Sequence, residues 1–217
     1  MFVKNHMTPN PINIPSDTPV FEALTILKRQ KIRQLPVVDD GRLVGLVTER
    51  DLLTVSPSPA TSLSIHEINY LLSKMTVREV MIKNPTLLSQ DTTIEEAAVI
   101  MREHKFGSLL VVEDKKLVGI ITESDLFDAI VEIFGFRRAG TRLVLETENR
   151  TGALANLLSI VRDHGVNVIG LAVMEIPELK IQVMLRLATS KLGLLEGKLK
   201  EAGFQVNSIC ETCRTSI

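Results

Sequence analysis

The stretch GRLVGLVTERDLL at residues 41–53 returns, with few changes, as KKLVGIITESDLF at residues 115–127. The offset of 74 residues holds without a gap back to the beginning of each copy, and 20 of the 47 aligned pairs between residues 7–53 and 81–127 are identical. Agreement over such a length does not arise by chance. The first part of the chain is therefore a tandem duplication, and an internal repeat of this kind decides the architecture.

The first half of each copy is predicted to be a short extended piece followed by a helix. In the first copy the helix is expected to begin at Thr18, with Pro19 in its first position. In the second copy it is expected to begin at Thr92, with Glu95 completing a capping box.

The second half of each copy is predicted to be a hairpin and a helix. Residues 35–38 and 43–47 alternate little and are strongly apolar, and the turn at 39–42 contains a glycine. Thr48 is expected to begin the final helix. The unit is thus β-α-β-β-α, and its strands are too apolar to stand exposed, so each copy should bury one face against its twin.

The motifs M-x-x-N-P (7–11), L-P-V-V-D (35–39) and L-V-G-L-V-T-x-x-D-L (43–52) resemble those of the CBS domain. Two such domains in tandem resemble a Bateman module, here over about residues 1–135. The predicted boundaries are 1–60 and 77–135 for the two CBS domains, 61–76 for a connector helix and 139–213 for a third domain.

The pairs Thr48 with Asp51 and Thr122 with Asp125 admit two interpretations. Thr-x-x-Asp at a helix start is a capping box that requires no ligand. Alternatively, the carboxylate accepts hydrogen bonds from ribose hydroxyls while the threonine and the helix N-terminus face phosphate. The CBS resemblance implies the second role, with AMP, ADP, ATP or S-adenosylmethionine as a regulatory ligand and with no catalytic cofactor.

Further residues are expected to complete two nucleotide sites. Donors for phosphate are Arg33, Gln34 and Arg50 in the first copy and Ser108 in the second, and the adenine is expected to stack near Ile12, Ile14, Thr86 and Leu88. At the positions of Arg33 and Arg50 the second copy has Gly107 and Ser124. The two sites should therefore bind unequally.

After residues 137–140 the repeat stops, and a β-α-β-β-α-β order is predicted, which is a ferredoxin-like arrangement. The expected elements are strand 141–147, helix 153–164, strand 167–175, strand 179–188, helix 191–201 and strand 205–209. Pro177 falls in a hairpin turn, and Gly165 and Gly203 fall where the helices should end. The overall fold class is therefore mixed α/β.

The stretch LETENRTGALANLL at 145–158, with GVNV at 165–168, resembles an ACT domain. The resemblance implies an amino-acid pocket at a dimer interface, lined here by Asn149, Gly152, Ala153, Leu154 and Asn167. Asn149 and Thr151 replace the aspartate and proline that are usual in that family. A dimerising domain with an empty pocket is the alternative.

The connector between the copies contains a Pro- and Ser-rich turn and a short helix that Ser64 and Glu67 would cap. This connector, together with the CBS–CBS–ACT order, resembles that of the acetoin utilisation proteins. The resemblance implies a role in acetoin and butanediol catabolism. The alternative, which assigns the connector no specific role, is a linker helix that packs on the module.

Composition excludes several classes of function. With 25 Lys plus Arg and 26 Asp plus Glu, the net charge of −1 argues against nucleic-acid or membrane binding. The longest charge-free apolar stretch, 166–174, is too short to span a bilayer, and the first residues have no apolar signal segment, so a cytoplasmic location is expected. Two cysteines, as C-E-T-C at 210–213, form no disulfide framework.

No nucleophile–base set, phosphate-loop motif or metal-ligand spacing is visible, so an enzyme is not expected. The sequence instead predicts a regulatory sensor that forms a homodimer and acts on a protein target. The sequence does not identify that target. A structural dimerisation module with no ligand is the alternative.

Overall fold

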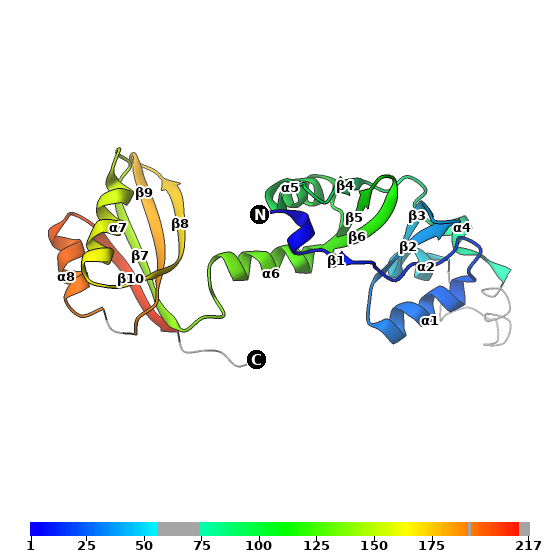
Figure 1. Cartoon of the computed structure of the whole chain (residues 1–217), viewed down its shortest axis with the longest axis horizontal. Coiled ribbons are helices and arrows are strands. Elements are labelled where there is room, and N and C mark those ends of the chain that lie inside the picture. The colour runs from blue at the N-terminus through cyan, green and yellow to red at the C-terminus, as the bar shows by residue number, and fades with distance from the viewer. Residues whose placement is uncertain (56–73, 191, 213–217) are drawn as a thin grey trace. The chain divides into compact units, whose positions relative to one another are not determined.

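The computed structural model describes residues 1–55, 74–190 and 192–212. The chain forms two compact units, Met1–Leu126 and Phe127–Ile217, each of which mixes helices and strands (Figure 1). A connector helix was predicted over 61–76, with a cap formed by Ser64 and Glu67. Its residues 61–73, including the cap, lie outside the described residues.

The first unit holds both repeats. The elements of the first repeat are η1 (Val3–Asn5), β1 (Thr8–Pro9), α1 (Val20–Gln30), β2 (Gln34–Asp39), β3 (Arg42–Thr48) and α2 (Glu49–Thr54). Those of the second are α4 (Val77–Val80), β4 (Leu87–Ser89), α5 (Ile94–His104), β5 (Ser108–Glu113), β6 (Lys116–Thr122) and α6 (Glu123–Ile133), which continues into the second unit.

Two helix starts differ from the sequence prediction by one residue. Helix α1 begins at Val20 with Pro19 as its N-cap. In the second repeat the capping box is Thr93 with Glu96, and Thr92 lies before the helix, where its carbonyl accepts a hydrogen bond from the Val3 amide at 2.8 Å. The predicted hairpins are present in both repeats, as is the helix that begins after Thr48.

The segment that leads each repeat pairs with the hairpin of the other repeat. Thr8 of β1 lies opposite Ile120 of β6, and Ile82 forms the corresponding bridge with Leu46 of β3. The two pairings are related by the same 74-residue offset as the sequence repeat. The repeats are therefore interlocked around a pseudo-twofold axis.

The same exchange extends upstream of these strands. The amide of Val3 donates to the Thr92 carbonyl at 2.8 Å, and the amide of Val77 donates to the Thr18 carbonyl at 2.9 Å. Both valines are fully buried. The core of the first repeat therefore includes Val77, which follows the connector in the sequence.

A small apolar cluster lies between the two hairpins, as the apolar strands predict. It consists of Leu46, Leu110 and Ile120, with Leu43 and Leu117 packed against it. Glycines allow the backbones to approach here: an added Cβ on Gly45 would lie 2.7 Å from the Met81 sulfur and 2.9 Å from the Ile82 carbonyl oxygen. Gly119 is approached in the same way, but by side-chain atoms of Met7 alone.

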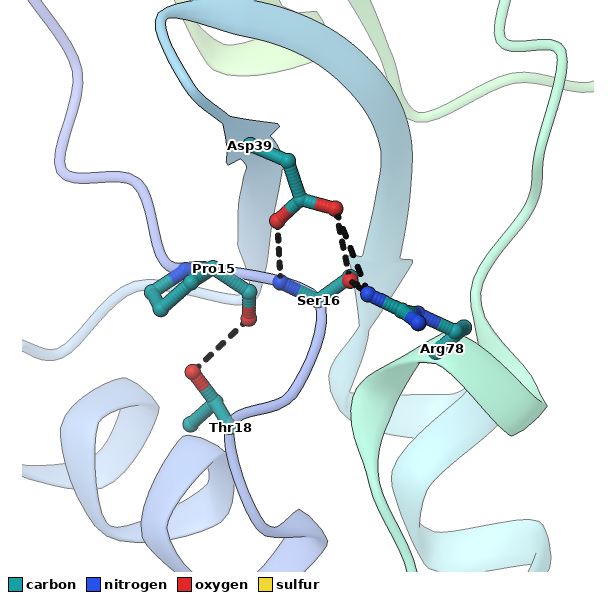
Figure 2. A network of polar contacts seen from close by, with 5 residues as sticks. All are labelled: Pro15, Ser16, Thr18, Asp39 and Arg78. Carbon is teal, nitrogen blue, oxygen red and sulfur yellow. Dashed lines mark hydrogen bonds and ion pairs between the residues drawn. The ribbon is translucent and has the colours of Figure 1, made fainter.

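A polar cluster ties α4 to the first repeat (Figure 2). The Asp39 carboxylate accepts hydrogen bonds from the Ser16 amide at 2.8 Å and from the Ser16 hydroxyl at 2.7 Å. Arg78 donates to Ser16 Oγ through Nε and Nη2 and lies 3.7 Å from Asp39 Oδ2. The bonds from Ser16, supported by the Arg78 charge, lower the pKa of Asp39 below its ordinary value of 3.8.

The second unit contains one four-stranded sheet with two helices on one face (Figure 1). Its elements are β7 (Gly140–Glu148), α7 (Ala153–Asp163), β8 (Val168–Ile176), β9 (Lys180–Leu187), α8 (Leu194–Glu201) and β10 (Gln205–Thr212). The strand order is β10-β7-β9-β8, with every neighbouring pair antiparallel.

Several details of this unit differ from the expectation. Helix α8 begins at Leu194 after Gly193, three residues later than predicted, and β10 runs three residues further, to Thr212. Strand β7 is interior, because both β10 and β9 pair with it, and β10 is one of the two edges of the sheet. Glycines at 165 and 203 have positive φ and follow the two helices, as predicted.

Substitution of the two crossing glycines should have unequal effects. Gly45→Ala places a methyl group against a backbone carbonyl, which cannot rotate away, so we expect it to lower the free energy of unfolding by about 1–3 kcal/mol. Gly119→Ala meets only the flexible Met7 side chain and should cost less than about 1 kcal/mol. Urea unfolding of both variants measures the difference, and equal losses would contradict the assigned crossing geometry.

The Asp39 cluster predicts a pH-dependent stability. Because the native pKa is below 3.8, ionised Asp39 stabilises the fold above that pH, and its contribution is lost as the pH falls through the native value. Asp39→Asn should unfold at lower urea concentration than wild type at pH 7, and the gap should narrow below pH 4. The exposed Asp17→Asn is the control, expected to differ little from wild type. A gap that stays constant with pH would count against the cluster.

Candidate ligand-binding site

A cavity of about 470 Å³ lies between the two repeats of the first unit. The first repeat contributes Thr8, Pro11, Ile12, Lys31, Ile32, Arg33, Gln34 and Pro36, and the second contributes Gly107, Ile120, Thr122, Glu123 and Ser124. The lining combines proline and isoleucine side chains with two cations, Lys31 and Arg33, the Glu123 carboxylate and several hydroxyl and amide groups.

The end of α1 delivers the cationic wall. Lys31 caps this helix in the left-handed conformation, with φ 54°, and its amide donates to carbonyls of the last turn. The chain therefore turns sharply, and residues 32–34 reach the cavity before β2 continues. The Arg33 carbonyl accepts the Glu49 amide at 2.9 Å, which fixes this turn against α2.

Gln34 and Ser108 occupy equivalent positions in the two repeats, and they meet at the pseudo-twofold axis. The Ser108 hydroxyl donates to Gln34 Oε1. The amide nitrogen of Gln34 is consequently the end left for the cavity, and it lies 3.8 Å from where a Cβ on Gly107 would be. Ser108 itself is buried and does not line the cavity, so its role is to orient Gln34 as a hydrogen-bond donor.

The start of α6 forms the opposite wall. Asp125 Oδ2 accepts the Thr122 amide at 2.7 Å and the Thr122 hydroxyl at 2.8 Å, while the hydroxyl accepts the Asp125 amide. The capping interpretation of this pair is thus realised. Among the described contacts Asp125 Oδ1 has no hydrogen bond, and the first-turn residues Glu123 and Ser124 line the cavity.

The equivalent pair in the first repeat has the same capping geometry but a different surrounding. Thr48 and Asp51 form a capping box at α2 with bonds of 2.9 and 2.7 Å to Asp51 Oδ2. Neither they nor Arg50 line the cavity. Asp125 is not among the lining residues either, although its neighbours Glu123 and Ser124 are. Of the residues predicted to bind the nucleotide, the cavity is lined by Ile12, Arg33, Gln34 and Thr122.

The residues expected near the adenine also separate. Ile12 is about half exposed and lines the cavity. Ile14 does not: it is 4% exposed, and its amide and carbonyl bond to Pro36 and Val38, so it belongs to the core of the first repeat. Leu88 is likewise buried and pairs with Val111 in the sheet, and Thr86 lies outside the lining.

Sequence reasoning missed several lining residues. Lys31, Ile32 and Pro36 could have been found, because they flank Arg33 and Gln34 in the sequence. Thr8 and Ile120 could not, because they come together only through the exchange of leading segments between repeats.

In the second unit the residues predicted to bind an amino acid do not converge on one hollow. A surface hollow contains Asn167 together with the end of α7, but none of residues 149–154. Asn149 Nδ2 donates to Glu175 at 3.4 Å, Gly152 precedes α7 with a φ of 87°, Ala153 is buried, and Leu154 packs on the core. The Asn167 carbonyl accepts the Ala188 amide at 2.8 Å, next to the first residue pair of β8 and β9, so its backbone belongs to the strand pairing and not to a turn.

Other candidates are limited. Cys210 is exposed and free, and Cys213 lies outside the described residues. Within residues 1–55, 74–190 and 192–212 there is no cluster of three or more side chains suited to a metal ion. No helix in that part of the chain is long and apolar enough to cross a membrane.

A family model for the CBS domain matches residues 3–58 and 77–132, together more than half of the chain. The chain belongs to the CBS-domain family. The matched segments are the two repeats that form the cavity, and the match ends within α6 at residue 132.

Individual relatives match about three fifths of the chain. A CBS domain-containing protein of Dictyostelium discoideum is 34% identical over 135 residues, 61% of this chain and 93% of its own length. The solved structure of Arabidopsis thaliana CBSX2 in complex with AMP is 35% identical and has a TM-score of 0.50 over 61% of this chain and 97% of that chain. A Vibrio cholerae structure that carries the name acetoin utilization protein AcuB is 28% identical, with a TM-score of 0.52, over 63% and 96%.

Proposed function

We propose that this protein is a non-catalytic regulator that binds an adenine nucleotide, AMP in the first instance, in the cavity between its repeats. The observation that carries this proposal is the composition of the cavity wall. Apolar side chains, two cations, an amide donor and the start of a helix line one cavity of about 470 Å³. The relative CBSX2, solved with AMP, supports the same ligand class.

Different residues of the cavity lining are suited to different parts of a nucleotide. The adenine would stack on Ile12, Ile32 and Pro36, since flat apolar surface favours an aromatic ring. The phosphate would lie near Lys31 and Arg33, because charge-assisted hydrogen bonds are the strongest available there. The start of α6 adds amide donors for an anion.

The ribose hydroxyls would bind the side of the cavity formed by α6. Asp125 holds its cap through Oδ2 and keeps Oδ1 for a further donor, so one carboxylate can serve both predicted roles. Thr48, Asp51 and Arg50 would form the second, unequal site around α2. Gly107, which stands where the first repeat has Arg33, has no side chain, and an added Cβ would meet only Gln34 Nε2 at 3.8 Å, which leaves room for a ligand.

Regulation follows from the shared lining. A ligand that contacts both repeats can shift their equilibrium only by binding one arrangement better than another. We infer that this shift is the output, read by a protein target, in a cytoplasmic pathway of acetoin and butanediol catabolism. The AcuB-named neighbour supports the pathway assignment.

For the second unit we propose an ACT-type, ferredoxin-like domain over residues 139–213, after CBS domains at 1–60 and 77–135. The β-α-β-β-α-β order and the strand order β10-β7-β9-β8 support it. A small metabolite would bind near Asn149, Gly152 and Asn167, of which only Asn167 lines a surface hollow. A dimerising role without a ligand is the second candidate.

Nucleotide binding is tested by calorimetry with AMP, ADP, ATP and S-adenosylmethionine. Arg33→Ala should weaken AMP binding by roughly 10- to 150-fold, the loss expected for a charge-assisted hydrogen bond worth about 1.5–3 kcal/mol. Asp125→Ala should weaken it over the same range. If the wild-type protein binds none of the four compounds, the structural alternative holds.

Two matched variants serve as controls for this experiment. Arg42→Ala removes an exposed arginine of β3 that does not line the cavity, and AMP affinity should stay within about twofold of wild type. Asp51→Ala removes the equivalent cap at α2 and should leave the higher-affinity site intact. An equal loss from Asp51→Ala and Asp125→Ala would contradict the assignment of the cavity to the α6 side.

Homodimerisation is the second prediction of this proposal. Strands β8 and β10 are the edges of the second sheet, and unpaired edges favour pairing with another chain. Sedimentation equilibrium at micromolar concentration should give a mass of about twice 24.1 kDa. A monomer at every concentration tested would exclude it.

A further inference from the structure

Arg186 of β9 is a charged side chain buried to 1% exposure in the second unit. A buried guanidinium is costly unless its donors are satisfied. No ion pair to Arg186 is found among the described residues; instead Nη2 and Nε donate to the backbone carbonyl of Arg138 at 2.6 and 3.3 Å. Its guanidinium carbon lies 5.7 Å from the centre of the Phe136 ring, within the range of a cation–π contact.

Both partners of Arg186 belong to the segment that follows α6. The same segment lies against β8: a Cβ added to Gly170 would be 2.8 Å from the Phe134 carbonyl oxygen and 3.0 Å from its carbon. Gly170 is the residue opposite Arg186 in the β8–β9 register. Residues 134–138 are therefore held on two neighbouring strands, by backbone approach at one and by the buried arginine at the other.

Little slack remains between this segment and the helix. The amides of Phe134 and Phe136 donate to the carbonyls of Ile130 and Val131 at 3.1 and 3.0 Å, so the chain continues the last helical turn. Arg137 returns to α6 through an ion pair of 2.6 Å with Asp128. At its other end the same helix begins at Glu123; Glu123, Ser124 and the preceding Thr122 line the cavity.

We propose that Arg186 is a coupling residue: it fixes the C-terminal end of α6 to the β8–β9 sheet, so that a change at the start of α6 is transmitted to the second unit. The inference rests on the proposed nucleotide site, because ligand binding there is the change to be transmitted. The contacts of Arg186 with Arg138 and Phe136, which we call the clamp, require no ligand. Without the clamp, residues 134–138 could change conformation when the helix moves, and the sheet would not be displaced. A purely structural role would predict the same packing but no dependence of the transmitted change on Arg186.

The test is hydrogen exchange on the full chain with and without AMP. In wild type, AMP should slow exchange in peptides covering 107–125 and change it in peptides covering 168–187. Arg186→Met, which keeps the apolar stem and loses the donors, should keep AMP affinity within about twofold and the change at 107–125, but lose at least half of the change at 168–187. Persistence of the full distal change in Arg186→Met would overturn the proposal.

A ligand-free comparison separates this proposal from the nucleotide proposal. In the absence of AMP, Arg186→Met should speed exchange at residues 134–138 at least severalfold, because their anchor is lost. Unchanged exchange there would refute the clamp even if AMP binds. If AMP does not bind wild type while the ligand-free effect is present, the clamp stands and the nucleotide proposal fails.

Two further variants keep the test decisive. Arg142→Met changes the cross-strand neighbour of Arg186, a half-buried arginine of β7 with no described hydrogen bond to 134–138, and should leave the distal change intact. If Arg186→Met does not fold, Gly170→Ala takes its place, since the added methyl displaces the Phe134 backbone while Arg186 remains. Retention of the full distal change in folded Gly170→Ala would overturn the proposal equally.

Discussion

The exchange of leading segments between the two repeats is the interaction on which the first unit depends. Backbone hydrogen bonds join Ile82 to Leu46 in one direction and β1 to β6 in the other, and buried Val3 and Val77 secure the two ends. Unpaired backbone groups in an apolar setting are costly, so neither hairpin is satisfied by its own repeat alone. The cavity is a consequence, because it opens between walls that this exchange brings together.

The two repeats share one backbone arrangement, but they differ in side chains at equivalent positions near the cavity. A ligand could distinguish the two sites by these differences. Gly107 stands where the first repeat has Arg33, and Ser124 stands where it has Arg50. The polar cluster of Ser16, Asp39 and Arg78 also differs between the repeats. These three residues form one network, whereas their equivalents do not: Gln90 bonds Glu113, and Lys4 bonds Asp91. A duplicated chain can thus keep one fold while its two clefts diverge in charge.

Helix α6 connects the chemistry of the cavity with the second unit. Its first turn is capped by Asp125 and lines the cavity, and its last turn continues into a segment held by Gly170 and Arg186. A buried charge satisfied by a backbone carbonyl tolerates little displacement, since separation would leave the guanidinium unpaired. The proposed regulatory role thus has a physical element at each end of one helix.

The sequence by itself determined the duplication, the hairpins, the helix starts of the two repeats to within one residue and the order of elements in the second unit. These features depend on local propensity and capping, which near neighbours in the chain decide. The sequence also singled out Arg33, Gln34, Ile12 and Thr122, which do line the cavity. Only the tertiary structure decided that Ile14 lies in the core and that β7 is an interior strand. It likewise decided that Thr8 and Ile120 lie side by side and that Arg186 donates to the Arg138 carbonyl. These facts depend on contacts between residues far apart in the chain, and the period of a strand or helix reveals which residues share a face but not what that face meets.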